Sequence, residues 1–160
     1  FGIVAKLNYY TDEELKQIII RTSKVLKMPI DEMAALELAK RSRKTPRIAN
    51  RLFKRVRDFT LVAGDKTISL ETTKKALNRL KIDEYGLDSL DLEYLDALIT
   101  KFNGGPVGAG TIATSIGEEV TTVEEVVEPF LLQEGFVKRS QRGRIATEKA
   151  YNHLGIVIKK

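Results

Sequence analysis

The feature that most constrains this chain is the helix start at Thr45-Pro46-Arg47. A threonine hydroxyl caps the first turn of a helix, and proline fits the first helical position because its missing N–H has no partner there. Apolar residues then recur at helical spacing, so we predict a helix over residues 46–62. Arg47 stands in its first turn, on a rigid backbone that can present a guanidinium to an anion. From the residues alone, a solvated helix face is the simpler interpretation, since Arg47 follows a basic run (Lys40, Arg41, Arg43, Lys44).

Capping signals on both sides of this helix predict a small helical bundle. Thr11 and Glu14 have the spacing of a capping box, and apolar residues follow at helical intervals (Leu15, Ile18, Ile19, Val25, Leu26). Asp31 precedes a second helix whose apolar contacts we expect from Met33, Leu36 and Leu38. Ser69 or Thr67 starts a fourth helix. Residues 1–82 are therefore expected to form one four-helix domain.

The second half of the chain has the order of a winged helix-turn-helix. Asp88 with Asp91 opens a helix, and further helices are expected at about 111–116 and 122–133. Two strand-like stretches then flank Ser140-Gln141-Arg142-Gly143, which predicts a β-hairpin. Before them, residues 104–108 (Gly-Gly-Pro-Val-Gly) are interpreted as a loop. They lack the Gly-Lys-Ser/Thr ending of a phosphate-binding loop, and proline removes a donor N–H.

Charge is divided unevenly along the chain. Residues 1–84 carry 19 Lys and Arg against 11 Asp and Glu, whereas residues 85–160 carry 8 against 11. Within the acidic half, residues 138–149 hold five cations and one acid; the cations are Lys138, Arg139, Arg142, Arg144 and Lys149. Cations gathered on one hairpin are suited to binding DNA phosphates, which makes the hairpin, with Arg142 in its turn, the candidate DNA contact.

The residue inventory argues against chemistry catalysed by this chain alone. It has no cysteine, which fits a reducing cytoplasm, and one histidine, His153, in a terminal amphipathic segment. No metal site and no histidine-dependent nucleophile are therefore expected. The phosphate-loop pattern GxxxxGK[ST] is missing from all 160 residues. No apolar run approaches the roughly 20 residues of a membrane span.

Five stretches, in order from end to end, carry a resemblance to a known family. They are Phe1-Gly2-Ile3-Val4 with Tyr9-Tyr10, and residues 39–51, 101–108, 128–136 and 142–147. These stretches resemble the RuvB family of AAA+ ATPases, bacterial motors that drive branch migration of Holliday junctions in recombination and repair. The resemblance implies a mainly α fold, with a four-helix AAA+ lid over residues 1–82 and a winged helix with a β-hairpin wing over 86–160. It also implies a C-terminal fragment, since the chain starts at phenylalanine and lacks the large P-loop domain.

The same resemblance assigns roles to individual residues. Tyr10 and Arg47 fall on positions that contact the nucleotide, so ATP is the implied cofactor, with Mg²⁺ held by the missing large domain. Arg139 and Arg144 fall on DNA-binding positions, whereas Val120 stands where the family has a further DNA-contacting arginine. The implied partners are duplex DNA, Holliday junctions, RuvA and five further copies in a hexamer. The implied location is the cytoplasm, and the fragment alone is expected to be inactive as an ATPase.

The helix expected at 122–133 has the place of a recognition helix but an unsuitable charge. It and the residue after it contain four glutamates and no basic residue (Glu124, Glu125, Glu128, Glu134). Docking such a helix against phosphates would weaken binding, so we expect the hairpin to bind DNA without reading its sequence. Two alternatives remain: a stand-alone winged-helix regulator, and an adaptor whose winged helix binds protein.

Overall fold

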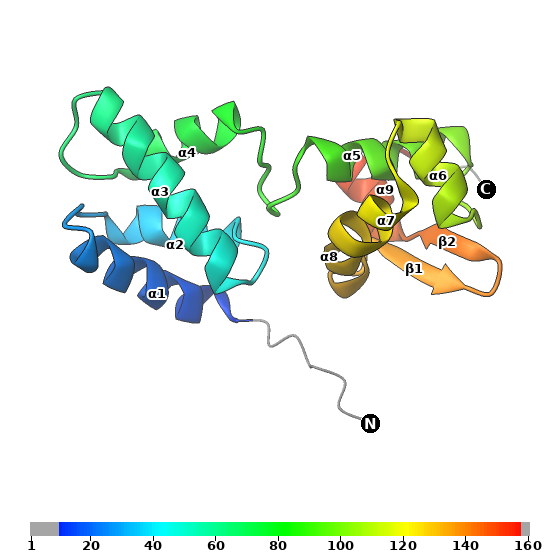
Figure 1. Cartoon of the computed structure of the whole chain (residues 1–160), viewed down its shortest axis with the longest axis horizontal. Coiled ribbons are helices and arrows are strands. Elements are labelled where there is room, and N and C mark those ends of the chain that lie inside the picture. The colour runs from blue at the N-terminus through cyan, green and yellow to red at the C-terminus, as the bar shows by residue number, and fades with distance from the viewer. Residues whose placement is uncertain (1–9, 158–160) are drawn as a thin grey trace. The chain divides into compact units, whose positions relative to one another are not determined.

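The computed structural model describes residues 10–157 and is mainly helical, with one short antiparallel hairpin near its C-terminal end (Figure 1). The chain forms two compact units, one ending at Leu87 and the other beginning at Asp88. The predicted fold class, mainly α with a β-hairpin in the second half, is confirmed, and one further helix follows the hairpin. The stretch Phe1-Gly2-Ile3-Val4 and Tyr9 lie outside the described residues.

Four helices build the first unit: α1 (Asp12–Val25), α2 (Glu32–Lys40), α3 (Pro46–Val62) and α4 (Leu70–Arg79). The predicted capping box begins α1, with the Thr11 and Glu14 side chains each accepting from the other's backbone N–H at 3.1 Å. At the start of α3 the Thr45 hydroxyl accepts from the N–H of Ile48 at 3.3 Å. Ser69 is the N-cap of α4. Local side-chain chemistry therefore sets where these helices begin.

All four helices contribute to the core of the first unit. Its fully buried larger side chains are Leu15, Ile19, Leu38, Phe53, Val56, Ile68 and Leu77. The loops before α2 and α4 are joined by backbone bonds, because Ile68 donates to Pro29 and accepts from Asp31, both at 2.9 Å. Met33, from which apolar contacts were expected, is 60% exposed, and Val25, which continues the apolar spacing of α1, is 72% exposed. Both residues lie at helix ends, where the apolar face of the helix extends beyond the neighbouring elements that cover the rest of it.

The second unit consists of short helices and the hairpin. Its elements are α5 (Ser89–Asp96), η1 (Ala97–Lys101), α6 (Ala109–Ile116), α7 (Val120–Thr122), η2 (Val123–Val127), α8 (Glu128–Gln133), β1 (Val137–Ser140), β2 (Gly143–Ala146) and α9 (Glu148–Leu154). The capping box of Asp88 and Asp91 opens α5 as predicted. The helix expected at 122–133 starts two residues earlier and is π-helical over its middle five residues.

The glycine-rich loop between η1 and α6 packs against β2. The backbone of Val107 bonds to that of Arg144 in both directions, at 3.1 and 2.7 Å, and Ala146 donates to Gly104 at 2.9 Å. Gly105 has a φ of +85°, and a Cβ there would lie 2.1 Å from the carbonyl oxygen of Arg144. A side chain at this position would therefore push the loop off the hairpin. The loop has a structural role and extends the hairpin along one edge.

Candidate functional sites

The two residues expected to contact a nucleotide lie at the same end of the first unit. The backbone N–H of Tyr10 donates to the carbonyl of Lys44 at 3.1 Å, and the Tyr10 side chain is half-buried against the core. Lys44 and Arg43 both have left-handed backbone angles, with φ of 59° and 53°. These angles turn the chain sharply before Thr45 caps α3, so that Tyr10 comes close to the helix start that carries Arg47.

Arg47 is exposed on the first turn of α3. Among the described residues it forms no hydrogen bond and no ion pair, so its guanidinium is available to an anion from outside this unit. The basic run before it is not uniformly solvated. Arg41 is buried, pairs with Glu37 at 2.8 Å and donates to the carbonyl of Ile82 at 3.1 Å. It therefore joins α2 to the segment after α4, a structural role that its sequence context did not reveal.

The hairpin formed by β1 and β2, here called the wing (residues 137–146), places its cations on different faces. Arg139 lies directly opposite Arg144 in the antiparallel register, and Lys138 lies opposite Ile145. Side chains alternate between the two faces of a strand, so Arg139 and Arg144 share one face and Lys138 takes the other. Arg142 is exposed in the two-residue turn, where its N–H donates to the Ser140 hydroxyl at 3.2 Å.

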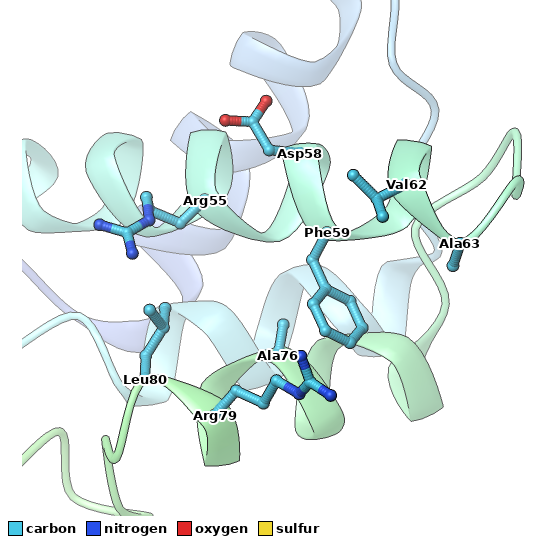
Figure 2. Close-up of a pocket in the computed structure, with 8 residues that line it drawn as sticks. All are labelled: Arg55, Asp58, Phe59, Val62, Ala63, Ala76, Arg79 and Leu80. Atoms are coloured by element: carbon cyan, nitrogen blue, oxygen red, sulfur yellow. The ribbon is translucent and has the colours of Figure 1, made fainter.

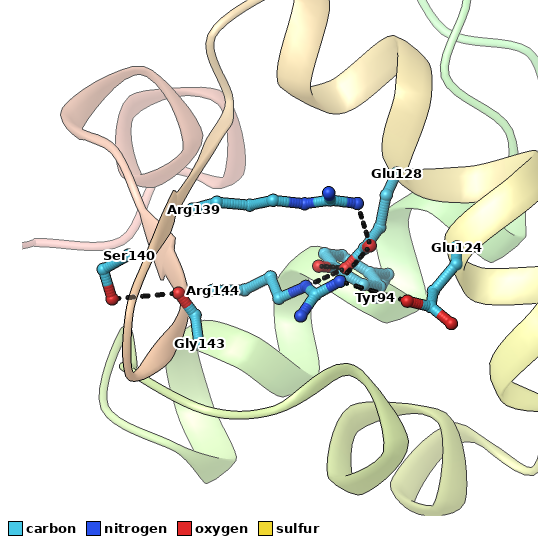
Figure 3. Close-up of polar contacts among 7 residues, drawn as sticks. All are labelled: Tyr94, Glu124, Glu128, Arg139, Ser140, Gly143 and Arg144. Carbon is cyan, nitrogen blue, oxygen red and sulfur yellow. Dashed lines mark hydrogen bonds and ion pairs between the residues drawn. The ribbon is translucent and has the colours of Figure 1, made fainter.

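Both arginines of that shared face reach one buried carboxylate, that of Glu128 at the start of α8 (Figure 3). Nε and Nη2 of Arg144 donate to its Oε2 and Oε1 at 2.8 and 3.0 Å. Nη2 of Arg139 donates to Oε1 over a longer 3.5 Å. The hydroxyl of Tyr94 on α5 donates to Oε2 at 2.6 Å. Four donors therefore surround a carboxylate that is fully buried.

Burial and these bonds raise the pKa of two members of the cluster, Tyr94 and Arg144. Desolvation, followed by the hydrogen bond to Glu128, raises the pKa of Tyr94, so its hydroxyl stays a donor at neutral pH. The hydrogen bond to Glu128 raises the pKa of the Arg144 guanidinium as well. The side chain of Arg144 is only 15% exposed and also lies 3.5 Å from Glu124, whereas that of Arg139 is 55% exposed. Arg139 is thus the more accessible of the two.

Glu128 does not lie on the exposed surface of its helix, where a residue that repels DNA would be expected. Its side chain is buried and its charge already paired, whereas Glu124 and Glu125 on the same helical run are exposed. The sequence held one signal of this. Glu128 sits between Val127 and Phe130 in the apolar stripe of its helix, and a buried acid requires a cationic or hydrogen-bonding partner. Sequence reasoning missed Tyr94 altogether, because this contact joins residues 34 positions apart.

An open groove of about 540 Å³ lies between α3 and α4 in the first unit (Figure 2). The Arg79 guanidinium stands 5.8 Å from the centre of the Phe59 ring, which projects from α3 toward α4. No histidine, serine or pair of carboxylates lines the groove; its residues are Arg55, Asp58, Phe59, Val62, Ala63, Ala76, Arg79 and Leu80. It therefore offers no acid–base or nucleophilic pair.

Residues 10–157 offer neither a metal cluster nor a membrane-spanning helix. That part of the chain has no group of three or more His, Cys, Asp or Glu side chains placed to hold a metal ion. His153 packs edge-on against Phe136, with ring centres 5.4 Å apart. None of the described helices has the length and apolar character needed to cross a membrane.

Two family models match the chain one after the other. The model of the RuvB AAA lid domain matches residues 10–83, and that of the RuvB C-terminal winged helix domain matches residues 84–155.

Whole sequences and solved structures agree with the domain matches. The chain is 58% identical over 156 residues to the Holliday junction branch migration complex subunit RuvB of Acholeplasma laidlawii, covering 98% of this chain and 46% of that protein. It is 56% identical over 154 residues to the same subunit of Staphylococcus aureus, with 96% and 46% covered. The structure of the Thermotoga maritima RuvB Holliday junction branch migration motor superimposes with a TM-score of 0.92 at 47% identity, over 99% of this chain and 53% of that one. The chain spans about half the length of the relatives it matches.

Proposed function

Because the chain belongs to the RuvB family through both of its domains, we propose that it is the lid and DNA-binding portion of an ATP-dependent motor that drives Holliday junction branch migration in recombination and repair. The lid covers about residues 1–82 and the winged helix residues 86–160. ATP and Mg²⁺ are bound mainly by a large ATPase domain ahead of the lid. The motor is a cytoplasmic hexamer on duplex DNA and works with RuvA.

In this proposal the lid contributes two residues to the nucleotide site. Arg47 offsets charge on the phosphates, because a guanidinium can pair with two phosphate oxygens at once. Tyr10 contacts the adenosine portion. The hydrogen bond from Tyr10 to Lys44 supports this assignment, since it holds both residues at one end of the lid. The exposure of Arg47 supports it too, because its guanidinium needs no rearrangement to meet a ligand held by another domain.

The winged helix supplies the contacts with DNA. The observation that carries this part is the register of the wing, which sets Arg139 opposite Arg144 on one face with Arg142 exposed in the turn. Such a cluster on a protruding hairpin meets phosphates whatever the base sequence. The exposed Glu124 and Glu125 on the helical run before α8 disfavour insertion of that run into a groove. Binding without sequence readout suits a motor that travels along any duplex.

The test is a titration of this chain against several unrelated duplexes at three salt concentrations. Arg139→Ala combined with Arg144→Ala should weaken binding to all duplexes alike. It should also flatten the plot of log affinity against log salt by about one unit for each phosphate that the missing arginines no longer neutralise. The matched control is Lys66→Ala with Lys74→Ala, which removes the same charge from exposed lid positions. Parent-like binding by the wing variant would refute the assignment.

The same titration separates the two alternative functions. A sequence-specific regulator would lose affinity for one duplex and not for the others. A protein-binding adaptor would bind none of the duplexes, and the parent, the wing variant and the lid control would not differ at any salt concentration.

A further inference from the structure

The wing carries two like charges in a position that is unfavourable by itself. Arg139 and Arg144 are direct cross-strand partners on the same face. Side chains at such positions start only about 4.5–5.5 Å apart at Cβ, and like charges there destabilise a hairpin. A nearby anion is therefore needed to keep both guanidinium groups on this face when no DNA is present.

Glu128 is that anion, and its bonding capacity is fully used. Its two oxygens accept from Tyr94, twice from Arg144 and once from Arg139. A carboxylate offers about four acceptor positions, so none remains for other donors. The exposed fraction of its side chain is 0%, so water does not compete for these positions. The hydrogen-bonded pair with Arg144 is bidentate, a geometry that fixes the plane of the guanidinium as well as its place.

We propose that Glu128 is a positioning residue for DNA binding, which holds Arg144 rigidly and Arg139 loosely so that the wing presents both to the phosphate backbone. This inference rests on the proposed binding of DNA through the wing. Arg144 donates from its Nε and Nη2 to Glu128, which leaves Nη1 as the group of this guanidinium that would donate to a phosphate. Arg139, with one contact of 3.5 Å and an exposed side chain, swings onto the DNA at little cost. Tyr94 supports Glu128 from the interior of the domain.

The alternative is that Glu128 acts on DNA only through its negative charge. The two roles predict opposite changes in DNA affinity when the charge of Glu128 is removed. Removing a charge that repels phosphates raises affinity, whereas removing a residue that positions two arginines lowers it. Loss of a pre-set orientation lowers DNA affinity by roughly a factor of two to ten for each rotamer-rich side chain. The number of phosphate contacts, read from the salt dependence, stays the same if the arginines still reach DNA.

Duplex titrations of Glu128→Gln against Glu125→Gln provide the test, because both variants remove one charge from the same helical run. Glu125 is exposed, and among the described residues it has no hydrogen-bond or ion-pair partner. We expect Glu128→Gln to lower affinity about fivefold or more at an unchanged salt slope. Glu125→Gln should bind as tightly as the parent or slightly more tightly. In a chain that already carries Arg139→Ala and Arg144→Ala, Glu128→Gln should have no further effect.

Equal affinities for the two glutamine variants would overturn the inference, and so would a loss that persists without the two arginines. If the double arginine variant itself binds like the parent, the proposed function of the wing fails instead. Thermal unfolding of each variant is measured alongside. If Glu128→Gln is unfolded at the assay temperature, Tyr94→Phe decides the matter, since it removes only the supporting hydroxyl. It should lower affinity about twofold at the same slope, and parent-like affinity would contradict the inference.

Discussion

The contact between the glycine-rich loop and the wing yields a prediction whose size follows from the structure. Gly105→Ala forces a side chain into a left-handed backbone conformation, which costs about 1–2 kcal/mol. The new Cβ would also lie 2.1 Å from the backbone oxygen of Arg144, so the loop must move. The two hydrogen bonds between Val107 and Arg144 then break, at about 0.5–1.5 kcal/mol each. The free energy of unfolding of the second unit should fall by about 2–5 kcal/mol.

For a unit of this size, that change lowers the melting temperature by roughly 8–40 °C. Scanning calorimetry of the whole chain measures it, with the lid as an unaltered reference in the same sample. Gly110→Ala is the matched control, because Gly110 is exposed in α6 and a Cβ there meets nothing within 4 Å. It should stabilise the unit by up to about 1 kcal/mol through helix propensity. A melting temperature for Gly105→Ala within about 2 °C of the parent would refute the role given to the loop.

Three further predictions concern the lid and the nucleotide. Thr45→Ala removes the cap of α3 and should lower the lid's melting temperature by about 4–8 °C, whereas Thr45→Ser should not; equal melting of the two would contradict the capping role. The 160-residue chain alone should hydrolyse no ATP, since it lacks the phosphate loop; turnover that survives repurification and disappears in Arg47→Ala would disprove this. Fused behind a relative's ATPase domain, Arg47→Ala should lower ATP turnover. Lys54→Ala, about 10 Å further along α3, should not, and equal effects would make Arg47 an ordinary surface residue.

The parts of the fold that depend on neighbours in the sequence could be predicted. Thr11, Thr45 and Asp88 act on backbone groups within three residues, so their patterns alone located the starts of α1, α3 and α5. The wing was predictable for the same reason, because its strands flank a short turn. The exposure of Met33 could not be predicted, because periodicity identifies the apolar face of a helix but not which elements cover it.

The candidate sites were predictable in their residues but not in their interactions. The family resemblance selected Arg139 and Arg144, and the place of Glu128 in an apolar stripe indicated that it needs a partner, but no local pattern joined this carboxylate to arginines 11 and 16 residues later. That arrangement arises only when α5, α8 and the wing pack together. The link between Tyr10 and Lys44 likewise depends on a turn made by two non-glycine residues with positive φ, which sequence patterns rarely indicate.

The central claim is that this chain supplies the lid and the DNA grip of a branch-migration motor. The most direct measurement joins it to the large ATPase domain of the Acholeplasma laidlawii relative, in place of that protein's own C-terminal half. ATP-dependent dissociation of a synthetic Holliday junction is then followed in the presence of the relative's RuvA. We predict that the chimera dissociates the junction and that Arg139→Ala with Arg144→Ala abolishes this. A folded chimera that leaves the junction intact, while the relative's own protein dissociates it, would contradict the claim.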